Sequence, residues 1–217
     1  MINWDSIQTV FLDMDGTLLD LHYDNHFWLA HVPQRYAEQH GMDPESAHAD
    51  LAVRYQRVVG TMQWYCVDYW TRELQLDIAK LKEEVEHLIA VHPHVPAFLS
   101  SLRTAGKRVT LVTNAHYKSL SLKMRRTGLS GYFDAIICAH DLGMPKEQAG
   151  FWEALQRLES YDPAATLLVD DSLPVLRSAR DYGIAHLLAV HQPDSRQPDK
   201  NVEEFEAVRS FRDIVPR

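Results

Sequence analysis

The chain has 217 residues, 46 % of them hydrophobic, which is enough to form a sizeable core in one domain with an insert or in two small domains. Its 22 Lys and Arg residues against 30 Asp and Glu residues give a formal net charge of −8, without the basic stripe that a nucleic-acid polymer or an anionic membrane would require. Cys66 and Cys138 are the only cysteines and lie outside any CxxC pattern, which argues against a disulfide framework or a zinc ribbon.

The first residues, MINWDSIQ, lack the basic and then apolar pattern of a secretory signal peptide. No uninterrupted apolar run approaches the roughly 20 residues that cross a bilayer. Two isolated cysteines also suit a reducing compartment. We therefore expect a cytoplasmic protein that does not enter a membrane.

Five short runs rich in β-branched residues and leucine predict buried strands: TVFLD (9–13), RVTLVTN (108–114), FDAIICA (133–139), ATLLVDD (165–171) and IAHLLAV (184–190). Helical patterns lie between the later runs, at residues 94–105, 117–127, 147–159 and 173–182, and three of them stop at a glycine. Strands that alternate with helices predict an α/β fold, with a parallel sheet covered by helices on both faces.

Residues 20–93, called here the helical segment, contain no convincing strand and predict about four amphipathic helices. The expected division is therefore a sheet core of residues 1–19 and 94–217 with an inserted helical subdomain of residues 20–93. Aromatic residues concentrate in this segment, in HYDNHFW (22–28) and QWYCVDYW (63–70). They suit the core of a small helical bundle, or one or two of them line a pocket and stack on a flat ring. Near the end of the chain, QPDSRQPDKN predicts a polar loop before a short terminal helix.

Polar residues follow the first predicted strand. Because side chains alternate along a strand, Asp13 and Asp15 point to the same side if the strand persists. They lie at the carboxyl end, where open α/β sheets bind ligands. Gly16 permits a tight turn whose N–H groups face an anion, and the hydroxyl of Thr17 can hold that turn. This pattern predicts a site for a phosphate and a metal ion.

The later strands end in the same way. LVTNAH ends with Thr113 and Asn114, MPKE offers Lys146 in a loop, and LLVDDS ends with Asp170 and Asp171. Because the carboxyl ends of parallel strands share one edge, these groups converge. Two pairs of carboxylates can hold Mg²⁺, which prefers oxygen ligands, and the metal ion offsets the repulsion between them.

These motifs, DMDGT, the Thr113 of LVTN, Lys146 and DDS, occur in the order found in the haloacid dehalogenase superfamily of phosphatases, which the chain resembles. The resemblance implies a Rossmann-like sheet with strand order 3-2-1-4-5. It also implies that the helical segment is a cap inserted after the first motif.

The resemblance implies roles for the site residues as well. Asp13 is expected to attack phosphorus and form an aspartyl-phosphate, and Asp15 to act as general acid and then base. The phosphoryl oxygens are expected to bind at Gly16, Thr113, Asn114 and Lys146. Mg²⁺ is expected at Asp13, the backbone carbonyl of Asp15, and Asp171, with Asp170 in support. The dehalogenases of the superfamily lack the acid at the position of Asp15, so dehalogenation is not expected.

A closer resemblance rests on LDMDGTLLDL, DNHFW, WYCVDYW, TNAH, PKE and DDS, which are similar to bacterial purine 5′-nucleotidases that act on GMP and IMP. It implies Mg²⁺-dependent hydrolysis of a small phosphate ester, a purine nucleoside monophosphate. Substrate contacts are expected from Asp24, Asn25, Trp64 and Tyr65. Two alternatives remain at this point: a phosphatase or phosphomutase for a small sugar or acid phosphate, and a non-catalytic protein that binds a phosphate ligand.

Overall fold

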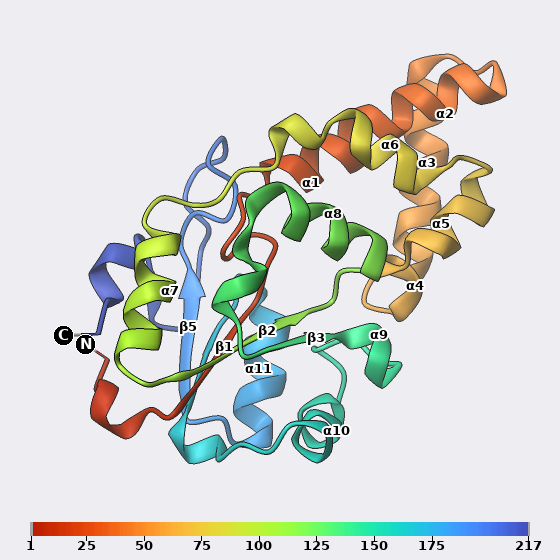
Figure 1. The fold of residues 1–217 in the computed structure, drawn as a ribbon. Helices are drawn as coiled ribbons and strands as arrows, with labels where there is room; N and C mark the ends of the chain where they lie inside the picture. Colours follow the sequence, from red (N-terminus) through yellow and green to blue (C-terminus); the bar gives the residue numbers. More distant parts are fainter. Residues whose placement is uncertain (1, 217) are drawn as a thin grey trace.

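Six strands form one sheet in the computed structural model, which describes residues 2–216 (Figure 1). The strands are β1 (Thr9–Leu12), β2 (Arg108–Thr113), β3 (Ala135–Cys138), β4 (Thr166–Val169), β5 (His186–Val190) and β6 (Ala207–Val208). Their order is β3-β2-β1-β4-β5-β6, and every neighbouring pair is parallel. The predicted α/β class and the order of the first five strands are confirmed. The sequence analysis missed β6, because two residues are too short to show an alternating pattern.

Helices cover both faces of the sheet. Helices α7 (Val95–Thr104) and α8 (Tyr117–Thr127) lie over one face, and α10 (Phe151–Leu158) and α11 (Leu173–Tyr182) lie over the other (Figure 1). Alternate strand residues face the two layers: Val10 and Leu12 pack in the cluster that contains Phe98 of α7, whereas Phe11 packs against Trp152 of α10. The sheet is therefore buried from both sides, as its apolar strands predict.

The predicted core helices match the observed ones apart from their ends. Helix α10 begins at Phe151 rather than at residue 147, because residues 145–150 form a loop that ends at Gly150 with a φ of +93°. That loop carries Lys146. A short helix, α9 (Ala139–Leu142), was not predicted, since four residues carry no helical period. The expected terminal helix is a 3₁₀ turn, Phe211–Ile214. The other 3₁₀ turns are Trp4–Ser6, Glu86–Leu88, Leu129–Tyr132 and Pro163–Ala165.

The helical segment contains more and shorter helices than the four expected. They are α1 (His22–His26), a π-helical turn (Phe27–His31), α2 (Val32–His40), α3 (Pro44–Val58), α4 (Met62–Tyr65), α5 (Val67–Leu74) and α6 (Ile78–Glu84). These helices enclose a hydrophobic cluster of their own, with Phe27, Leu51 and Trp70 among its members, which is distinct from the two clusters on the sheet. The segment projects from one end of the sheet, at the upper right of Figure 1.

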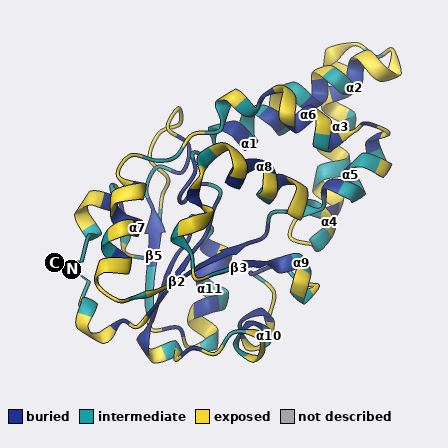
Figure 2. Ribbon diagram, viewed as in Figure 1, coloured by how far each residue is buried: buried dark blue, intermediate teal, exposed yellow. Residues whose placement is uncertain are grey.

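The chain enters and leaves the helical segment at one place. Leu19 and Val91 form an antiparallel bridge, and the N–H of Asp20 donates to the carbonyl of Ala90 at 2.9 Å. Figure 2 shows buried residues along the sheet and exposed residues on the outward helix faces. Within residues 2–216, no helix combines the length and the apolar character needed to cross a membrane.

Candidate active site

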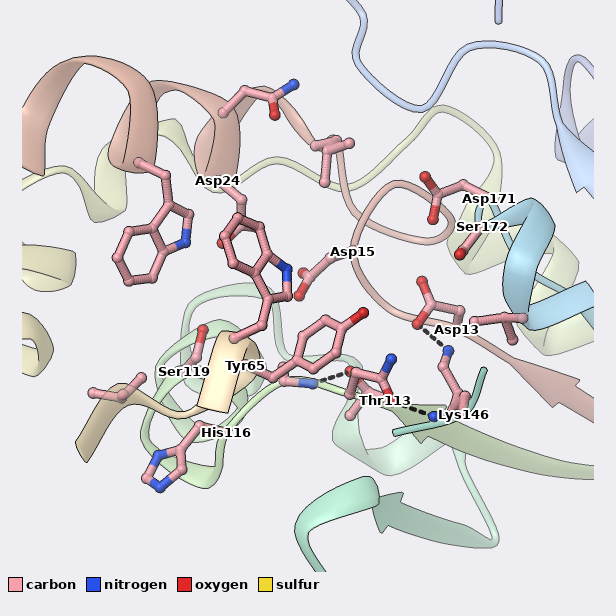
Figure 3. A pocket seen from close by; sticks show the side chains of 18 of the residues that line it. Asp13, Asp15, Asp24, Tyr65, Thr113, His116, Ser119, Lys146, Asp171 and Ser172 are labelled. Carbon is pink, nitrogen blue, oxygen red and sulfur yellow. Dashed lines mark hydrogen bonds and ion pairs between the residues drawn. The ribbon is translucent and has the colours of Figure 1, made fainter. Parts of the chain in front are cut away.

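The loop after β1 places two acids at the carboxyl edge of the sheet. The N–H of Asp13 still donates to the carbonyl of Val169 in β4, at 3.1 Å, so Asp13 leaves the sheet at its edge. Gly16, with a φ of +82°, closes the turn by donating its N–H to the carbonyl of Leu19 at 2.7 Å. The side chains of Asp13 and Asp15 line one cavity (Figure 3).

Thr17 does not hold this turn, contrary to the expectation from the sequence. Its hydroxyl is buried and has no hydrogen-bond partner among the described residues. Backbone bonds already close the turn, including one from the N–H of Leu18 to the carbonyl of Met14 at 3.0 Å. The turn therefore needs no side-chain hydrogen bond.

Lys146 is the cation at the centre of the site. Its Nζ lies 2.6 Å from Asp13 Oδ1 and 2.6 Å from Asp170 Oδ2, and donates to the carbonyl of Val112 at 3.0 Å. The side chain is 2 % exposed, so bulk water does not screen these pairs. Burial alone would lower the pKa of Lys146, but the two carboxylates outweigh it and raise that pKa. Lys146 is therefore a fixed positive charge beside Asp13.

Three carboxylates gather beside Lys146. Single oxygen atoms of Asp13, Asp170 and Asp171 lie within 4.8 Å of one another. Burial, and after it the charges of Asp13 and Asp170, raise the pKa of Asp171 well above its ordinary value. The loop also packs tightly here, since a Cβ on Gly16 would lie only 2.8 Å from Cγ of Asp171. An all-oxygen cluster with excess negative charge suits a divalent hard cation.

Thr113 and Asn114 follow β2 and line the same cavity. The hydroxyl of Thr113 accepts the N–H of Ala115 at 3.0 Å, which holds the loop in a tight turn. The side chain of Asn114 is used for structure: Oδ1 accepts the backbone N–H of Lys146 at 2.9 Å, and Nδ2 donates to Glu147 at 2.9 Å. Asn114 thus positions the loop that carries Lys146.

Asp15 belongs to a second buried ion network, which the sequence analysis did not predict. Nζ of Lys123 lies 2.6 Å from Asp15 Oδ1 and 2.6 Å from Asp24 Oδ2. Nζ of Lys82 lies 3.2 Å from the other oxygen of Asp24 and 4.3 Å from the centre of the Phe27 ring. Burial would raise the pKa of Asp24, but Lys123 and Lys82 outweigh it and hold that pKa below its usual range.

Lys123 could have been found from the sequence. It stands in SLSLKMRRT, four positions after the buried Ser119 and therefore on the same helix face. A lysine on the buried stripe of an amphipathic helix needs a carboxylate partner, since a buried charge without one is costly. Lys82 gives the weaker signal, because IAKLKEE offers two lysines and only one of them is buried.

The two acids of the first motif are both harder to ionise than usual. Burial raises the pKa of Asp13 to about 6, with Lys146 opposing the shift and Asp170 adding to it. Burial also raises the pKa of Asp15 to about 6. The charge of Lys123 opposes this shift, and the charges of Asp24 and Asp13 add to it. Burial, with a smaller contribution from neighbouring carboxylates, therefore favours the protonated form of each acid.

The cavity of about 310 Å³ lies between the helical segment and the sheet edge. The helical segment contributes aromatic walls: Trp28, Tyr55, Trp64, Tyr65 and Trp70. Trp70 is also buried in the hydrophobic cluster of the segment, and Tyr69 packs there without lining the cavity. The aromatic residues therefore form part of a helical core and part of a cavity wall, and stacking on a ligand ring stays a prediction.

The four predicted substrate residues all line this cavity, but three of them already have polar partners. Asp24 is held by Lys123 and Lys82, as described above. Nδ2 of Asn25 donates to Asp194 at 2.7 Å, and the hydroxyl of Tyr65 donates to Glu147 at 2.8 Å. Trp64 contributes its backbone carbonyl to Trp70, which leaves its own ring on the cavity wall.

Comparison with known proteins agrees with this geometry. Residues 7–183 match the family model described as haloacid dehalogenase-like hydrolase. The chain is 36 % identical to the GMP/IMP nucleotidase YrfG of Escherichia coli (strain K12), over 99 % of this chain and 97 % of that protein. It is 25 % identical to the pyrimidine 5′-nucleotidase YjjG of the same organism, over 79 % of each chain.

Among solved structures, a haloacid dehalogenase phosphatase from Thermococcus onnurineus superimposes with a TM-score of 0.79. The match covers 96 % of each chain at 22 % identity, and it supports the fold.

Proposed function

The chain belongs to the haloacid dehalogenase-like hydrolases and is a phosphatase, and from this premise we propose that it hydrolyses purine nucleoside 5′-monophosphates such as GMP and IMP. The observation that carries the proposal is that Asp13, held 2.6 Å from Lys146, opens on a cavity whose far wall is aromatic. The likeness to a GMP/IMP nucleotidase over nearly the full length supports the choice of base.

In the proposed reaction, Asp13 is the nucleophile. A carboxylate oxygen of Asp13 bonds to phosphorus while the bond from phosphorus to the ester oxygen breaks, which gives an aspartyl-phosphate and a nucleoside. Lys146 keeps Asp13 in place and presents positive charge to the phosphoryl oxygens. A water molecule then attacks phosphorus, and the bond to Asp13 breaks to release phosphate.

Asp15 moves the proton in both steps. It gives its proton to the ester oxygen as that bond breaks, and it takes one from the attacking water in the second step. A pKa raised to about 6 lets the same group serve as acid and as base near neutral pH. Lys123 fixes the carboxyl group on the side of the helical segment, toward the leaving nucleoside.

Mg²⁺ fits the acidic cluster, and we propose that Asp13, Asp171 and the backbone carbonyl of Asp15 hold it. When bound, Mg²⁺ supplies positive charge that reduces the repulsion between the phosphate and the carboxylates. Asp170 supports this arrangement indirectly, because one of its oxygens is paired with Lys146 and the other accepts the N–H of Ser172 at 2.9 Å. Asp170 thereby orients Lys146.

The phosphoryl group is proposed to bind at the hydroxyl of Thr113, the backbone N–H of Asn114, and Lys146, which line the cavity at one sheet edge. The N–H of Gly16, expected from the sequence to face the phosphate, instead donates to the carbonyl of Leu19. The side-chain amide of Asn114 is engaged with Glu147, so its backbone is the donor in this proposal. Preorganised donors of this kind act without reorganising during the reaction.

The helical segment, residues 20–93, is proposed to act as the cap that covers the substrate and excludes water. Its single crossing at Leu19 and Val91 supports movement about one place. The purine base is proposed to lie against Trp64 and Tyr65, with Asp24 and Asn25 at the polar end of the cavity. A cavity of about 310 Å³ suits one small ester rather than a nucleic-acid strand, in line with the net charge of −8.

The experiment that tests this proposal measures phosphate release with Mg²⁺ from GMP, IMP, AMP, UMP, phosphoglycolate and glucose 1-phosphate. The Asp13→Asn variant serves as the blank. We expect a marked preference in kcat/KM for GMP and IMP. Preference for the sugar or acid phosphate would overturn the nucleotidase assignment, and conversion of glucose 1-phosphate to an isomer without phosphate release would indicate a mutase.

A further inference from the structure

A second group of metal-binding side chains lies outside the acidic site. Single ligand atoms of Cys66, His116 and His140 lie within 4.8 Å of one another. Cys66 precedes α5 in the helical segment, whereas His116 precedes α8 and His140 lies in α9, both on the sheet core. We propose that these three residues form a site for Zn²⁺ that ties the helical segment to the core.

His140 shows the clearest sign of a missing partner. Its Nε2 is buried and has no hydrogen-bond partner within residues 2–216. Its other ring nitrogen, Nδ1, lies 3.6 Å from Sγ of Cys138, so a proton on Nδ1 leaves the lone pair on Nε2. A buried polar atom without a partner destabilises the folded state, and a bound cation would satisfy it. Burial lowers the pKa of His140 to about 4, which keeps the ring neutral as a ligand must be.

His116 has the outer contact typical of a metal-bound imidazole. Its Nε2 lies 3.6 Å from Oδ2 of Asp68, and a carboxylate behind the ring orients it and increases its basicity. In that tautomer Nδ1 holds the lone pair, which now accepts the N–H of Lys118 at a long 3.3 Å. Exchange of this weak hydrogen bond for a metal bond requires little movement. Burial lowers the pKa of His116 as well.

The donor set distinguishes this site from the acidic one. Sulfur and imidazole nitrogen bind Zn²⁺ at about 2.0 to 2.3 Å, which places tetrahedral ligands about 3.3 to 3.8 Å apart. The three side chains would therefore close in by about 1 Å, with water in the fourth position. Sγ of Cys66 is held in place by the N–H of Tyr69 at 3.4 Å. Mg²⁺ prefers oxygen ligands and would not compete here.

The three residues lie at the junction between the helical segment and the sheet core. Polar contacts already join the helical segment to the core at this corner: Lys118 Nζ lies 2.6 Å from Asp68, and the hydroxyl of Tyr65 donates to Glu147. A metal ion on Cys66, His116 and His140 adds bonds across the same junction. Zn²⁺ therefore holds the segment against the core and slows any step that requires it to move away.

The test uses Co²⁺ as a probe of the full-length protein in excess Mg²⁺, because a cobalt ion bound to a thiolate gives a charge-transfer absorption band. We expect that band at one equivalent per chain, and we expect it to persist in Asp13→Asn, which alters the acidic site. Cys66→Ser should abolish it, and His140→Gln should weaken Co²⁺ binding about tenfold or more. His48→Gln, a change at an exposed histidine, serves as the matched control and should have no effect. Absence of the band in the unaltered chain, or its survival in Cys66→Ser, would overturn the site.

The second part of the test measures whether Zn²⁺ holds the helical segment against the core. Zn²⁺ should slow amide hydrogen exchange in residues 62–74 of the unaltered chain but not of Cys66→Ser. Zn²⁺ should also inhibit phosphate release at saturating Mg²⁺, and Cys66→Ser should need about tenfold more Zn²⁺ for the same inhibition. If Zn²⁺ had the same effect on hydrogen exchange and on phosphate release in the unaltered chain and in Cys66→Ser, the proposal that Zn²⁺ holds the segment would be wrong. The absorption and exchange readouts do not depend on turnover, so they stand whatever ester the enzyme prefers.

Discussion

Lys123 joins the helical segment to the acid of the first motif, since its Nζ lies 2.6 Å from Asp15 and 2.6 Å from Asp24. Asp24 comes from α1 and Lys123 from α8, so the ion pair crosses the boundary between the helical segment and the core. Asp24 shares the charge of Lys123 and raises the pKa of Asp15. The presence of the helical segment over the site thereby favours the protonated form of Asp15, which its proposed role as general acid requires.

Lys123→Met should therefore damage both stability and proton transfer. The variant leaves Asp15 without its partner Lys123, and breaking a buried ion pair costs about 3 to 5 kcal/mol in the free energy of unfolding. Because Lys123 lowers the pKa of Asp15, its loss should move the pH profile of kcat to higher pH. Urea unfolding and a pH series of kcat measure the two effects.

Lys118→Met is the control for this change. Lys118 lies on the same helix, but it is exposed, and its surface pair with Asp68 is worth at most about 1 kcal/mol. If Lys123→Met behaved like Lys118→Met in both measurements, the ion pair would have no role in the reaction.

In the metal-free protein, the free energy of unfolding should depend on pH because burial within the acidic cluster raises the pKa of Asp13. The pKa of Asp13 is raised from 3.8 to about 6, so the folded state binds more protons than the unfolded state between these values. Stability from this group is therefore present below pH 4 and is lost as the pH rises to 6, by about 3 kcal/mol. Asp13→Asn removes this titration. The variant should gain stability relative to the unaltered chain from pH 4 to pH 7 in EDTA, as measured by urea unfolding. A difference that does not change with pH would argue against the raised pKa.

Gly16→Ala should disrupt the proposed Mg²⁺ site through one contact. The new Cβ would lie 2.8 Å from Cγ of Asp171, so that carboxylate must move. A displacement of about 1 Å at a catalytic group can lower the rate about 100-fold, and the Mg²⁺ concentration for half-maximal activity should rise. Gly106→Ala has a similar φ of +67° with no atom within 4 Å of the new Cβ, and it should keep full activity despite a strain of about 1 to 2 kcal/mol. Equal activity in the two variants would show that Asp171 tolerates displacement.

Trp64→Ala should change substrate preference without affecting the chemical step. If the purine base lies on this ring, loss of stacking removes about 1 to 3 kcal/mol, which raises KM for GMP about 5- to 150-fold. KM for ribose 5-phosphate, which has no base, should stay unchanged. Steady-state kinetics on both esters measure this, with Trp4→Ala as the control because Trp4 packs on Phe98, outside the cavity. A parallel rise in KM for both esters would place the base elsewhere.

The fold could be predicted where the hydrophobic periodicity of the sequence is strong. Five strands and four core helices follow from apolar runs and helical patterns, whereas the strand order followed from the resemblance to the haloacid dehalogenase superfamily. The helices of the helical segment were predicted less well, because α1 and α4 have five and four residues and show no period. Pairs that join distant residues, such as Lys123 with Asp15, are set by tertiary packing, so the local sequence does not identify the partner. This pair was not predicted, although a lysine on a buried helix face implies a carboxylate partner.

The central claim is that Asp13 carries the phosphoryl group during turnover. The most direct test is to quench the enzyme during hydrolysis of GMP, reduce the acyl phosphate with borohydride, and map the product by mass spectrometry. An aspartyl-phosphate is reduced to homoserine, so we expect homoserine at position 13 in the quenched enzyme and none in enzyme without substrate. Homoserine at another aspartate, or its absence from enzyme that is releasing phosphate, would contradict the account.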